Sequence, residues 1–546
     1  MSVNSTDSST LAVDVRRFPW IRRLAADYVY NFSSVSPFFT GDPADQAAWA
    51  QAIARTQRHA RKHAEIAAAI AEQQRRRGAP PAAVAASQKL ADPQAVAIVT
   101  GQQAGLFGGP VFTLLKALTA LKLAARVTRE HRVPCVAVFW IDAEDHDWDE
   151  VRSCPVFDES LNLHPVALPP RKPVDYSPVA SIKLDDSVAQ TLQLLEETLP
   201  ATEFKPALVE ELRSIYRPGA GMADAFGAWL ERLLGDRGLV VYDASDPAAK
   251  PLACDVFTRE LSMPGETGRR AAAAGADLVA RGYHSQVNAG DALALFHIDG
   301  GRRPIRQQNG GFVAGEQTFD ASALVAKAAA EPAAFSPNVL LRPVVQDALF
   351  PTVCYVAGPN ELAYLGQLRG VYEHFGVPMP IMYPRASATL LDSAALRFLS
   401  KYDVPLEALQ AQDDSALNAL LASQIPASVN ASLDGAAADI DRALARVIEA
   451  MPALDPTLEG AARSTLVRMQ HDLQTLRSKT IQAAKKRDET LRRQFTRTRA
   501  LVFPGGEPQE RAVGFVSFLN QYGPALVQRL DEQIPIDLGK HWLVVV

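Results

Sequence analysis

Three stretches of this sequence combine residue types and spacings that could support chemistry. The first is a glycine-rich turn, and its candidate binding residues are Thr100, Gly101, Gln102, Gln103, Gly105 and Gly109. Glycines let the backbone approach a ligand, and a helix beginning after Pro110 would direct its unpaired N–H groups at an anion or a nucleotide. The turn has neither the Gly-Lys-Ser/Thr ending of a Walker A loop nor the GxGxxG spacing. The alternative is a turn that serves only tight packing of a strand against a helix.

The second stretch is an acidic loop around one histidine, in which Glu144, Asp145, His146 and Asp147 are the candidate catalytic residues. Carboxylates and an imidazole at this density can act as a general base, bind an ammonium group or hold a divalent cation. Like charges this close should raise the pKa of at least one carboxyl group. No second histidine or cysteine recurs at ligand spacing, so no dedicated metal site is predicted. The alternative is a solvated acidic cap on the following helix.

The third group combines a cation with a second polar turn. Arg342 could bind a carboxylate or phosphate through two parallel hydrogen bonds, or form a structural ion pair with an acid such as Asp347. Arg385, which follows a later apolar run, has the same two possibilities. The other candidate binding residues of this group are Gln346, Asp347, Gly358, Asn360, Glu361 and Tyr364.

Short apolar runs come directly before these motifs and predict the strands that position them. Residues 96–99 and 136–141 are continuous apolar runs, which are typical of parallel strands buried on both faces of a sheet. A helical pattern joins them into one strand–helix–strand unit. Further strands are expected within residues 239–245, 353–361 and 380–385. The predicted fold class is therefore α/β, with an open parallel sheet.

Ligands bind such sheets at the carboxyl ends of the strands. The glycine-rich turn and the acidic loop leave successive parallel strands at that edge. We therefore expect Asp145 and His146 to lie beside Gln102 and Gly105 in one cleft.

Two interruptions divide the predicted sheet region, which spans residues 1–385. Residues 158–185 are rich in proline, and residues 292–319 have the pattern of strands joined by glycine-rich turns. We interpret both as segments inserted into the sheet. An alanine-rich pattern without proline predicts one long helix over residues 45–77.

Residues 386–500 change in composition to alanine, leucine and charge, with apolar residues at three- and four-residue spacing. This pattern predicts an antiparallel helical coiled coil whose turn contains Pro452 and Pro456. Its first arm is acidic and its second arm is basic, so the two arms should attract each other. Because the basic arm is then paired with the acidic arm, its charge gives little reason to predict nucleic-acid binding. Residues 501–546 end in an apolar run and should return to the sheet region.

Composition limits the class of protein as a whole. The chain has 546 residues, of which 48% are hydrophobic and 21% are charged, as in a globular protein of two or three structural units. Its formal net charge of -5 does not favour nucleic acid or an anionic membrane as a partner. The sequence lacks a bilayer-spanning apolar run and a signal-peptide pattern, so we expect a cytoplasmic protein. Its four cysteines are far apart and should be reduced.

Six motifs together resemble the bacillithiol biosynthesis cysteine-adding enzyme family. In chain order they are TGQQAGLFGGP, VFWIDAEDHDWDE, LRPVVQD, YVAGPNELAY, MPIMYPR and the late PQER with NQYG. The likeness extends from about Tyr28 to the C-terminus. The family usually has threonine where this chain has Gly108, which removes one hydroxyl donor from the turn.

The resemblance implies a Rossmann-like core with inserted connecting segments and a coiled-coil domain that forms a homodimer. It also implies the last step of bacillithiol synthesis, which joins the carboxyl group of cysteine to the amine of glucosaminyl malate. In that family the core cleft holds the substrates, which would place them here against residues 100–105, 144–147 and 360–361 and Arg342.

Amide formation adds a chemical requirement. A free carboxylate is a poor acyl donor, so ATP or another activating nucleotide is the suspected cosubstrate, although the sequence lacks HIGH-type and KMSKS-type signatures. An acidic-loop residue such as Asp145 would accept the amine proton, while Arg342 and Arg385 would bind the malyl carboxylates. Two alternatives stay open: a nucleotide-binding transferase that acts on another amine, and a coiled-coil scaffold protein.

Overall fold

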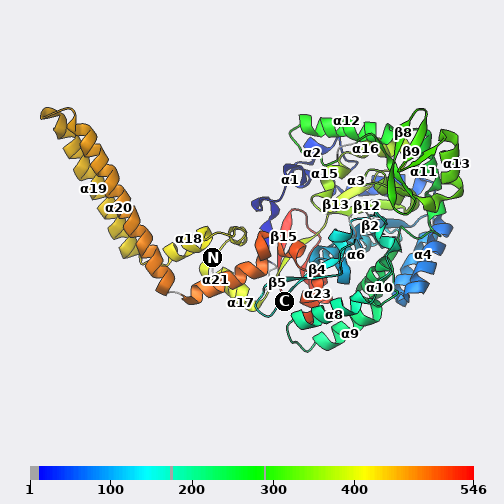
Figure 1. The fold of residues 1–546 in the computed structure, drawn as a ribbon, viewed down its shortest axis with the longest axis horizontal. Helices are drawn as coiled ribbons and strands as arrows, with labels where there is room; N and C mark the ends of the chain where they lie inside the picture. The colour runs from blue at the N-terminus through cyan, green and yellow to red at the C-terminus, as the bar shows by residue number, and fades with distance from the viewer. Residues whose placement is uncertain (1–10, 172–175, 288–289, 488) are drawn as a thin grey trace. The chain divides into compact units, whose positions relative to one another are not determined.

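Figure 1 shows the chain as a computed structural model. The described residues are 11–171, 176–287, 290–487 and 489–546. They form two compact units: residues up to 390 with 509–544 and 546, and residues 391–508 with 545. Most of the N-terminal residues on which the signal-peptide argument rests lie outside the described residues, as does part of the proline-rich insertion.

A five-stranded parallel sheet forms the centre of the first unit. In the order β13-β12-β2-β3-β6, its strands are β13 (Ile381–Pro384), β12 (Thr352–Ala357), β2 (Val96–Gln103), β3 (Cys135–Asp142) and β6 (Val240–Asp243). All the strands expected from the apolar runs are present, and the α/β class is confirmed. From β2 the chain adds β3 and β6 on one side of the sheet, and later β12 and β13 on the other side. The boundary between β2 and β12 is therefore a topological switch point, and open α/β sheets bind ligands at such points.

Helices cover this sheet and explain why its strands read as continuous apolar runs. The connection from β2 to β3 is α6 (Val111–His131), which packs on both strands. Helix α3 (Gln46–Arg58) packs on β2 and β12, and α4 (His63–Arg77) and α10 (Met222–Leu234) pack on β6. The inner residues of β2 and β3 are consequently buried.

The prediction of one helix over residues 45–77 is wrong, because α3 and α4 are separate helices. The break contains neither glycine nor proline. Instead, Arg61 in the break donates hydrogen bonds to the Thr56 carbonyl at 2.7 Å and, from two nitrogens, to the Asp347 carbonyl at 3.2 and 3.0 Å. Tertiary hydrogen bonds thus override a favourable local helix propensity.

Both predicted insertions contain strands. The second forms an antiparallel sheet in the order β10-β9-β8-β7-β11, with β7 (Ala292–Ile298), β8 (Arg302–Gln308), β9 (Gly311–Ala314), β10 (Gln317–Phe319) and β11 (Phe335–Pro337). The first contributes β5 (Leu163–Ala167), which pairs with β4 (Ser153–Phe157) as a hairpin. Strands β7 to β10 lie within the predicted bounds of 292–319, whereas β11 lies beyond them, so the small sheet extends further along the chain than predicted.

Shorter helices complete the first unit. They are α1 (Arg23–Tyr30), α2 (Phe32–Val35), α5 (Pro81–Gln88), α7 (Trp148–Val151), α8 (Ser187–Thr198), α9 (Lys205–Ile215), α11 (Cys254–Ser262), α12 (Glu266–Ala280), α13 (Ala321–Ala330), α14 (Arg342–Leu349), α15 (Glu361–Leu365), α16 (Arg369–Phe375), α22 (Gln509–Ala512), α23 (Phe515–Tyr522) and α24 (Ala525–Gln533). Among the described residues, no helix combines the length and apolar character needed to cross a membrane.

A three-stranded sheet brings the two ends of the chain together. Strand β15 (Lys540–Val545) pairs antiparallel with β1 (Leu11–Asp14), and β14 (Ser387–Leu391) lies on its other side. Residues 509–544 therefore fold as part of the first unit.

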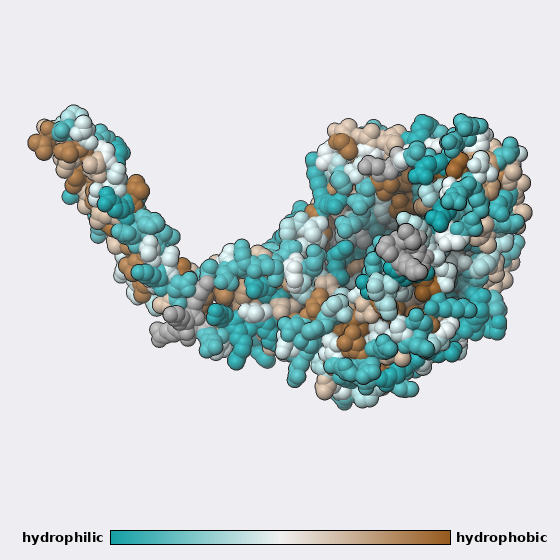
Figure 2. Space-filling view, in the orientation of Figure 1, coloured by the Kyte–Doolittle hydropathy of each residue, from teal (hydrophilic) through white to brown (hydrophobic). Residues whose placement is uncertain are grey.

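The second unit is helical. Its helices are α17 (Ser393–Tyr402), α18 (Ser415–Ser423), α19 (Ala427–Ala450), α20 (Leu458–Arg487) and α21 (Glu489–Val502). The predicted hairpin is confirmed in α19 and α20, and contacts such as Arg477–Asp434 join the basic arm to the acidic one. Figure 2 shows hydrophobic side chains on its surface, and the exposed ones are Val429, Val447, Leu454, Val467, Met469 and Leu476.

Gly108 shows why the glycine-rich turn needs glycine. Its φ is +94°, and a Cβ atom there would lie 2.2 Å from Cζ of Phe515 on α23. The Phe515 ring in turn stacks on Trp229, whose indole N–H donates to the Phe107 carbonyl at 3.1 Å. A side chain at residue 108 would therefore push against a packed aromatic pair. The threonine expected from the family resemblance does not fit this arrangement without a shift of Phe515.

We expect Gly108→Ala to lower the free energy of unfolding by about 1–3 kcal/mol more than Gly78→Ala, because overpacking adds to backbone strain. Gly78 is the matched control, since its φ of +68° imposes the same kind of strain but a Cβ atom there would have no neighbour within 4 Å. Denaturant melts of both variants measure the difference. Equal losses would show that Phe515 yields without cost.

Candidate active site

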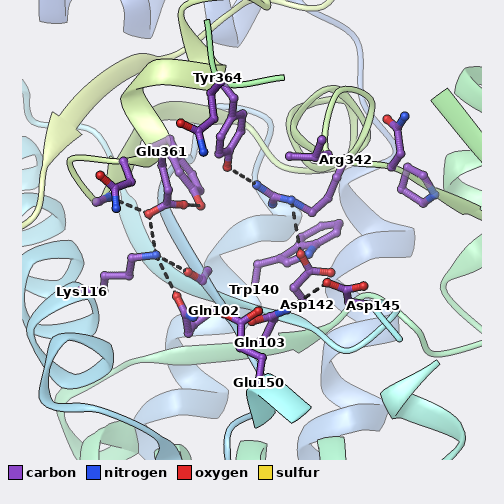
Figure 3. A pocket seen from close by; sticks show the side chains of 18 of the residues that line it. Gln102, Gln103, Lys116, Trp140, Asp142, Asp145, Glu150, Arg342, Glu361 and Tyr364 are labelled. Carbon is purple, nitrogen blue, oxygen red and sulfur yellow. Dashed lines mark hydrogen bonds and ion pairs between the residues drawn. The ribbon is translucent and has the colours of Figure 1, made fainter. Parts of the chain in front are cut away.

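A cavity of about 650 Å³ lies at the carboxyl ends of β2, β3 and β12 (Figure 3). Gly101, Gln102 and Gln103 line it from β2, Asp142 from β3 and Tyr355 from β12. The inserted sheet, α14 and the turn after β12 provide further walls. Every lining residue belongs to the first unit.

Most candidate residues from the sequence meet in this cavity. Those that line it are Gly101, Gln102, Gln103, Asp145, His146, Arg342, Gly358, Asn360, Glu361, Tyr364 and Arg385. The prediction that Asp145 and His146 share one cleft with Gln102 is confirmed, but Gly105, which was expected beside them, does not line the cavity. Gln103 Nε2 donates to Asp145 Oδ2 at 2.9 Å. The cause is the pairing of β2 with β3, which sets the two strand ends side by side.

The other candidates lie outside the cavity wall. They are Thr100, Gly105, Gly109, Glu144, Asp147, Gln346 and Asp347. The Thr100 hydroxyl donates to the Val356 carbonyl at 3.0 Å, inside the sheet. Glu144 is buried in an ion pair with Lys250, and Asp147 caps the first turn of α7. For Asp147, the structure therefore matches the acidic-cap alternative.

The glycine-rich turn does not form the predicted anion cradle. After Gln103 the chain packs on itself, and a Cβ atom on Gly105 would lie 3.2 Å from Gly109 Cα. The first N–H of α6, from Val111, donates to the Val513 carbonyl at 3.0 Å. The helix instead presents the side chains of Phe112 and Lys116 to the cavity.

A buried ion pair between Lys116 and Glu361 joins two walls of the cavity (Figure 3). Lys116 Nζ lies 2.6 Å from Glu361 Oε2 and donates to Gly101 O at 2.8 Å and Gln102 Oε1 at 3.1 Å. Glu361 also accepts a backbone N–H at 2.6 Å and the Tyr355 hydroxyl at 2.9 Å. Burial acts to raise the pKa of Glu361, but Lys116 and these donors outweigh it and hold the pKa below its usual value.

Arg342 reaches into the cavity with its guanidinium held on two sides. Its Nη1 donates to Gln346 Oε1 and its Nη2 to the Tyr364 hydroxyl, both at 3.2 Å. Its Nε lies 3.6 Å from Asp142 Oδ2, so the acid beside it is Asp142 and not the expected Asp347. A guanidinium has five N–H groups, and these three partners leave two of them for a ligand.

Asp145 is fixed by three donors. They are Gln103 Nε2 at 2.9 Å, Arg302 Nη1 at 3.1 Å and the His146 backbone N–H at 2.7 Å. Arg302 comes from the inserted sheet and also donates to the Pro337 carbonyl at 2.9 Å. The inserted sheet therefore holds the acidic loop in place through one arginine.

Two further carboxyl groups in the cavity, Asp142 and Glu150, have raised pKa values. Burial is the main cause for both, and Arg342 opposes it at Asp142. The side chain of Asp142 is nevertheless 31% exposed, so a ligand in the cavity can reach it. Carboxyl groups with raised pKa values are suited to proton transfer near neutral pH.

Cations gather around the ring of Phe112 at another part of the wall. Arg385, Arg511 and Lys116 lie 5.2, 5.8 and 5.9 Å from its centroid. Arg385 is held by Glu510, whose Oε1 lies 2.7 Å from Nη2. The C-terminal segment thus supplies both Arg511 and the acid that holds Arg385.

Several functional candidates were missed from the sequence. Lys116 had a signal, since it is a lone charge in the apolar stretch TLLKALTAL, and Asp142 and Glu150 border the recognised acidic loop. Arg511 belongs to the PQER motif quoted for the family resemblance but was given no role in the site, and Arg302 had no signal; only the folded insertion and C-terminal segment bring these two residues to the cavity. In the part of the chain that the structure describes, no three His, Cys, Asp or Glu side chains gather as metal ligands would.

Asp347, a rejected candidate, has a structural role behind Arg342. It accepts hydrogen bonds from the Tyr372 hydroxyl at 2.5 Å and from Gln346 Nε2 at 2.9 Å, and Gln346 in turn accepts from Arg342. Burial raises the pKa of Asp347 to about 6 despite these donors. Because the pKa is higher in the folded protein, ionisation of Asp347 opposes folding as pH rises from about 4 to 6.

Replacement of Asp347 by asparagine removes this ionisation. The stability of Asp347→Asn relative to wild type should therefore improve with rising pH, by on the order of 3 kcal/mol between pH 4 and pH 7. Melting temperatures across this range measure the effect, with Asp255→Asn, at an 86% exposed carboxylate, as the control for loss of one charge. A pH-independent difference at residue 347 would contradict the raised pKa.

Two family models match almost the whole chain. Residues 11–386 match "Bacillithiol biosynthesis BshC, N-terminal Rossmann-like domain", and residues 388–546 match "Bacillithiol biosynthesis BshC, C-terminal coiled-coil domain". These descriptions agree with the parallel sheet and with the α19–α20 hairpin.

Relatives named "Putative cysteine ligase BshC" match over similar lengths. The protein from Salinibacter ruber is 32% identical over 96% of both chains. Those from Symbiobacterium thermophilum and Solibacter usitatus are 33% and 30% identical, over 94% and 97% of this chain and 96% and 98% of their own. The chain therefore belongs to the bacillithiol biosynthesis BshC family.

Proposed function

We propose that this protein is a ligase that joins the carboxyl group of cysteine to the amine of glucosaminyl malate. The names of the relatives support the cysteine ligase activity, and the family places it in bacillithiol biosynthesis. The amine substrate is the one that the family resemblance implies, and the chemistry of the cavity supports it. A cavity lined by this many charged groups also favours an enzyme over a coiled-coil scaffold.

The observation that carries this proposal is the pair formed by Arg342 and Asp142. In glucosaminyl malate, the amine and the malyl group are attached to neighbouring carbons of the sugar, so a cation and an anion lie close together. A matching site needs an arginine beside a carboxylate, and Arg342 Nε lies 3.6 Å from Asp142 Oδ2 in the cavity wall. The two available N–H groups of Arg342 would bind a malyl carboxylate, while Asp142 faces the amine.

The acyl donor needs activation, and the proposal includes ATP or another nucleoside triphosphate as the cosubstrate. A leaving phosphate is anionic and requires cations that are already in position. Because residues 104–110 of the glycine-rich turn do not line the cavity, Lys116, Arg385 and Arg511 around Phe112 are the groups that suit this role. Arg511 is the exposed member of the three.

Mass spectrometry of the purified protein with glucosaminyl malate, cysteine and ATP tests this function. We expect the amide product only when all three are present. Replacement of glucosaminyl malate by glucosamine, which lacks the malyl carboxylates, should strongly reduce the product. A product formed equally well from glucosamine would favour a transferase that acts on another amine.

The two arginines in the cavity should respond differently to replacement by lysine. Arg342→Lys keeps the charge but loses the paired N–H groups, so KM for glucosaminyl malate should rise about 10- to 100-fold, or ~1.5–3 kcal/mol. Arg385→Lys is the comparison, because Arg385 is held by Glu510 and lies with the cations proposed for the phosphate, so its replacement should leave KM for glucosaminyl malate unchanged. Steady-state kinetics with thermal melts distinguish the two results. An Arg342→Lys variant that melts lower but keeps its KM would make Arg342 a structural residue.

We also propose that the α19–α20 hairpin forms a homodimer with a second copy. Helix α20 carries Met469 and Leu476 seven residues apart, the spacing of one coiled-coil face, and they are 38% and 52% exposed. Exposed apolar side chains at this spacing favour association with another helix. Charged residues of the two arms already pair within the hairpin, as Arg477 does with Asp434.

Negative charges placed on this apolar face of α20 should dissociate the dimer. The double variant Met469→Asp, Leu476→Asp should be monomeric at micromolar concentration, because two carboxylates would be buried unpaired at the seam. Gln474→Asp, an exposed position between them in sequence, is the control and should stay dimeric. Light scattering gives the masses. A monomeric wild type, or a dimeric double variant, would contradict the proposed seam.

A further inference from the structure

The carboxylates that line the cavity differ in how many donors already hold them. Asp145 and Glu361 are each held by three donors. Gln103 also interacts with the Glu150 carboxylate and acts to lower its pKa, against the effect of burial. Within the described residues, Asp142 instead has Arg342 Nε at 3.6 Å, beyond hydrogen-bond distance.

We propose that Asp142 is the catalytic residue that accepts the proton of the attacking amine, and that Asp145 is a positioning residue. This inference rests on the proposed function, and it assigns the general base to Asp142 in place of the expected Asp145. A general base needs a lone pair directed at the substrate. Three donors already occupy three of the roughly four lone-pair sites of the Asp145 carboxylate, whereas Arg342 Nε, at 3.6 Å, leaves more of the Asp142 lone pairs open to a substrate.

In the proposed step, a C–N bond forms and a bond from carbon to a phosphate oxygen breaks. The neutral amine nitrogen of glucosaminyl malate attacks the carbonyl carbon of cysteine activated by the nucleoside triphosphate, and a C–N bond forms. The nitrogen becomes cationic and passes one proton to a carboxylate oxygen of Asp142. The bond from the carbonyl carbon to the phosphate oxygen breaks, and the phosphate group leaves with the electron pair. Asp142 then returns the proton to water.

The position of Asp142 suits this role on three counts. It ends β3 at the edge of the sheet where the cavity lies, and its side chain is partly exposed there. It lies beside Arg342, which would hold the malyl carboxylate next to the amine. Burial also raises its pKa, which brings the proton affinity of Asp142 closer to neutral pH.

Other charged groups around Asp142 also affect its pKa. The titratable and charged groups that interact with it are Arg342, Tyr364, Asp145, Glu144, Glu150, Arg302 and Lys250. The arginines and Lys250 favour the ionised form, whereas burial and the acids oppose it. A pH dependence of kcat can therefore be assigned to Asp142 only by comparing variants.

Asp145 has the contacts of a positioning residue. Arg302 connects it to the Ser336 hydroxyl at 3.0 Å and to the Pro337 carbonyl at 2.9 Å, both on β11 of the inserted sheet. Gln103 connects it to the end of β2. Its loss should therefore displace the acidic loop and alter substrate binding more than proton transfer.

Steady-state kinetics from pH 5 to pH 9 on wild type, Asp142→Asn, Asp145→Asn and Glu150→Gln test the assignment. Asp142→Asn should lower kcat by about 10²- to 10⁴-fold and remove the rise of kcat with pH on the acid side. Asp145→Asn should raise KM while its kcat keeps that rise. Asp142→Asn with kcat within threefold of wild type, or loss of the acid-side rise in Glu150→Gln alone, would overturn the inference.

Chemical rescue gives a second measurement if Asp142→Asn does not fold. Asp142→Ala leaves room for a small carboxylate, so added formate should restore part of its kcat, whereas Asp145→Ala should not respond. Rescue of Asp145→Ala alone would overturn the inference. A wild type that forms no amide from glucosaminyl malate would overturn the proposed function, and the inference with it. An active wild type whose Asp142 variants stay active would overturn only the inference.

Discussion

Charged side chains withdrawn from bulk water must be paired, and this requirement organises the cavity. Lys116 is paired with Glu361, Arg302 approaches Asp145, and Arg385 is paired with Glu510. Each pair joins segments that are far apart in sequence: α6 with the turn after β12, the inserted sheet with the acidic loop, and the end of β13 with the C-terminal segment. Loss of one partner would leave a buried charge uncompensated, so these pairs hold the wall together as well as charging it.

Arg342 and Asp142 differ from these pairs because their distance leaves both groups available. The guanidinium is oriented by Gln346 and Tyr364, which are neutral and do not cancel its charge. The acid beside it is partly exposed and has a raised pKa. A substrate with adjacent positive and negative groups would pair with both of these side chains. The reaction is therefore placed at the part of the cavity wall whose charged groups have the fewest partners within the protein.

The sequence was sufficient for the parallel sheet, because strands buried on both faces appear as continuous apolar runs and their carboxyl ends share one edge. It was therefore also sufficient to bring Gln103, Asp145 and Arg342 together. It failed at Gly105 and Gly109, since a glycine needed for packing and one needed for a ligand look the same in sequence. It also failed at Arg302 and Arg511, whose positions depend on long-range folding of the insertion and of the C-terminal segment.

The pairing of β1 with β15 has a consequence for synthesis on the ribosome. Residues 11–14 are synthesised long before their partner strand, residues 540–545. At about 5–20 residues per second, the interval is roughly 30–100 s. During this time the β1 edge is unpaired, and until residue 510 is made Arg385 also lacks its partner Glu510, so the nascent chain carries an exposed strand and, for part of the interval, an unfinished cavity. Premature termination before residue 510 would therefore yield a chain that lacks both the partner of Arg385 and the cavity-lining Arg511.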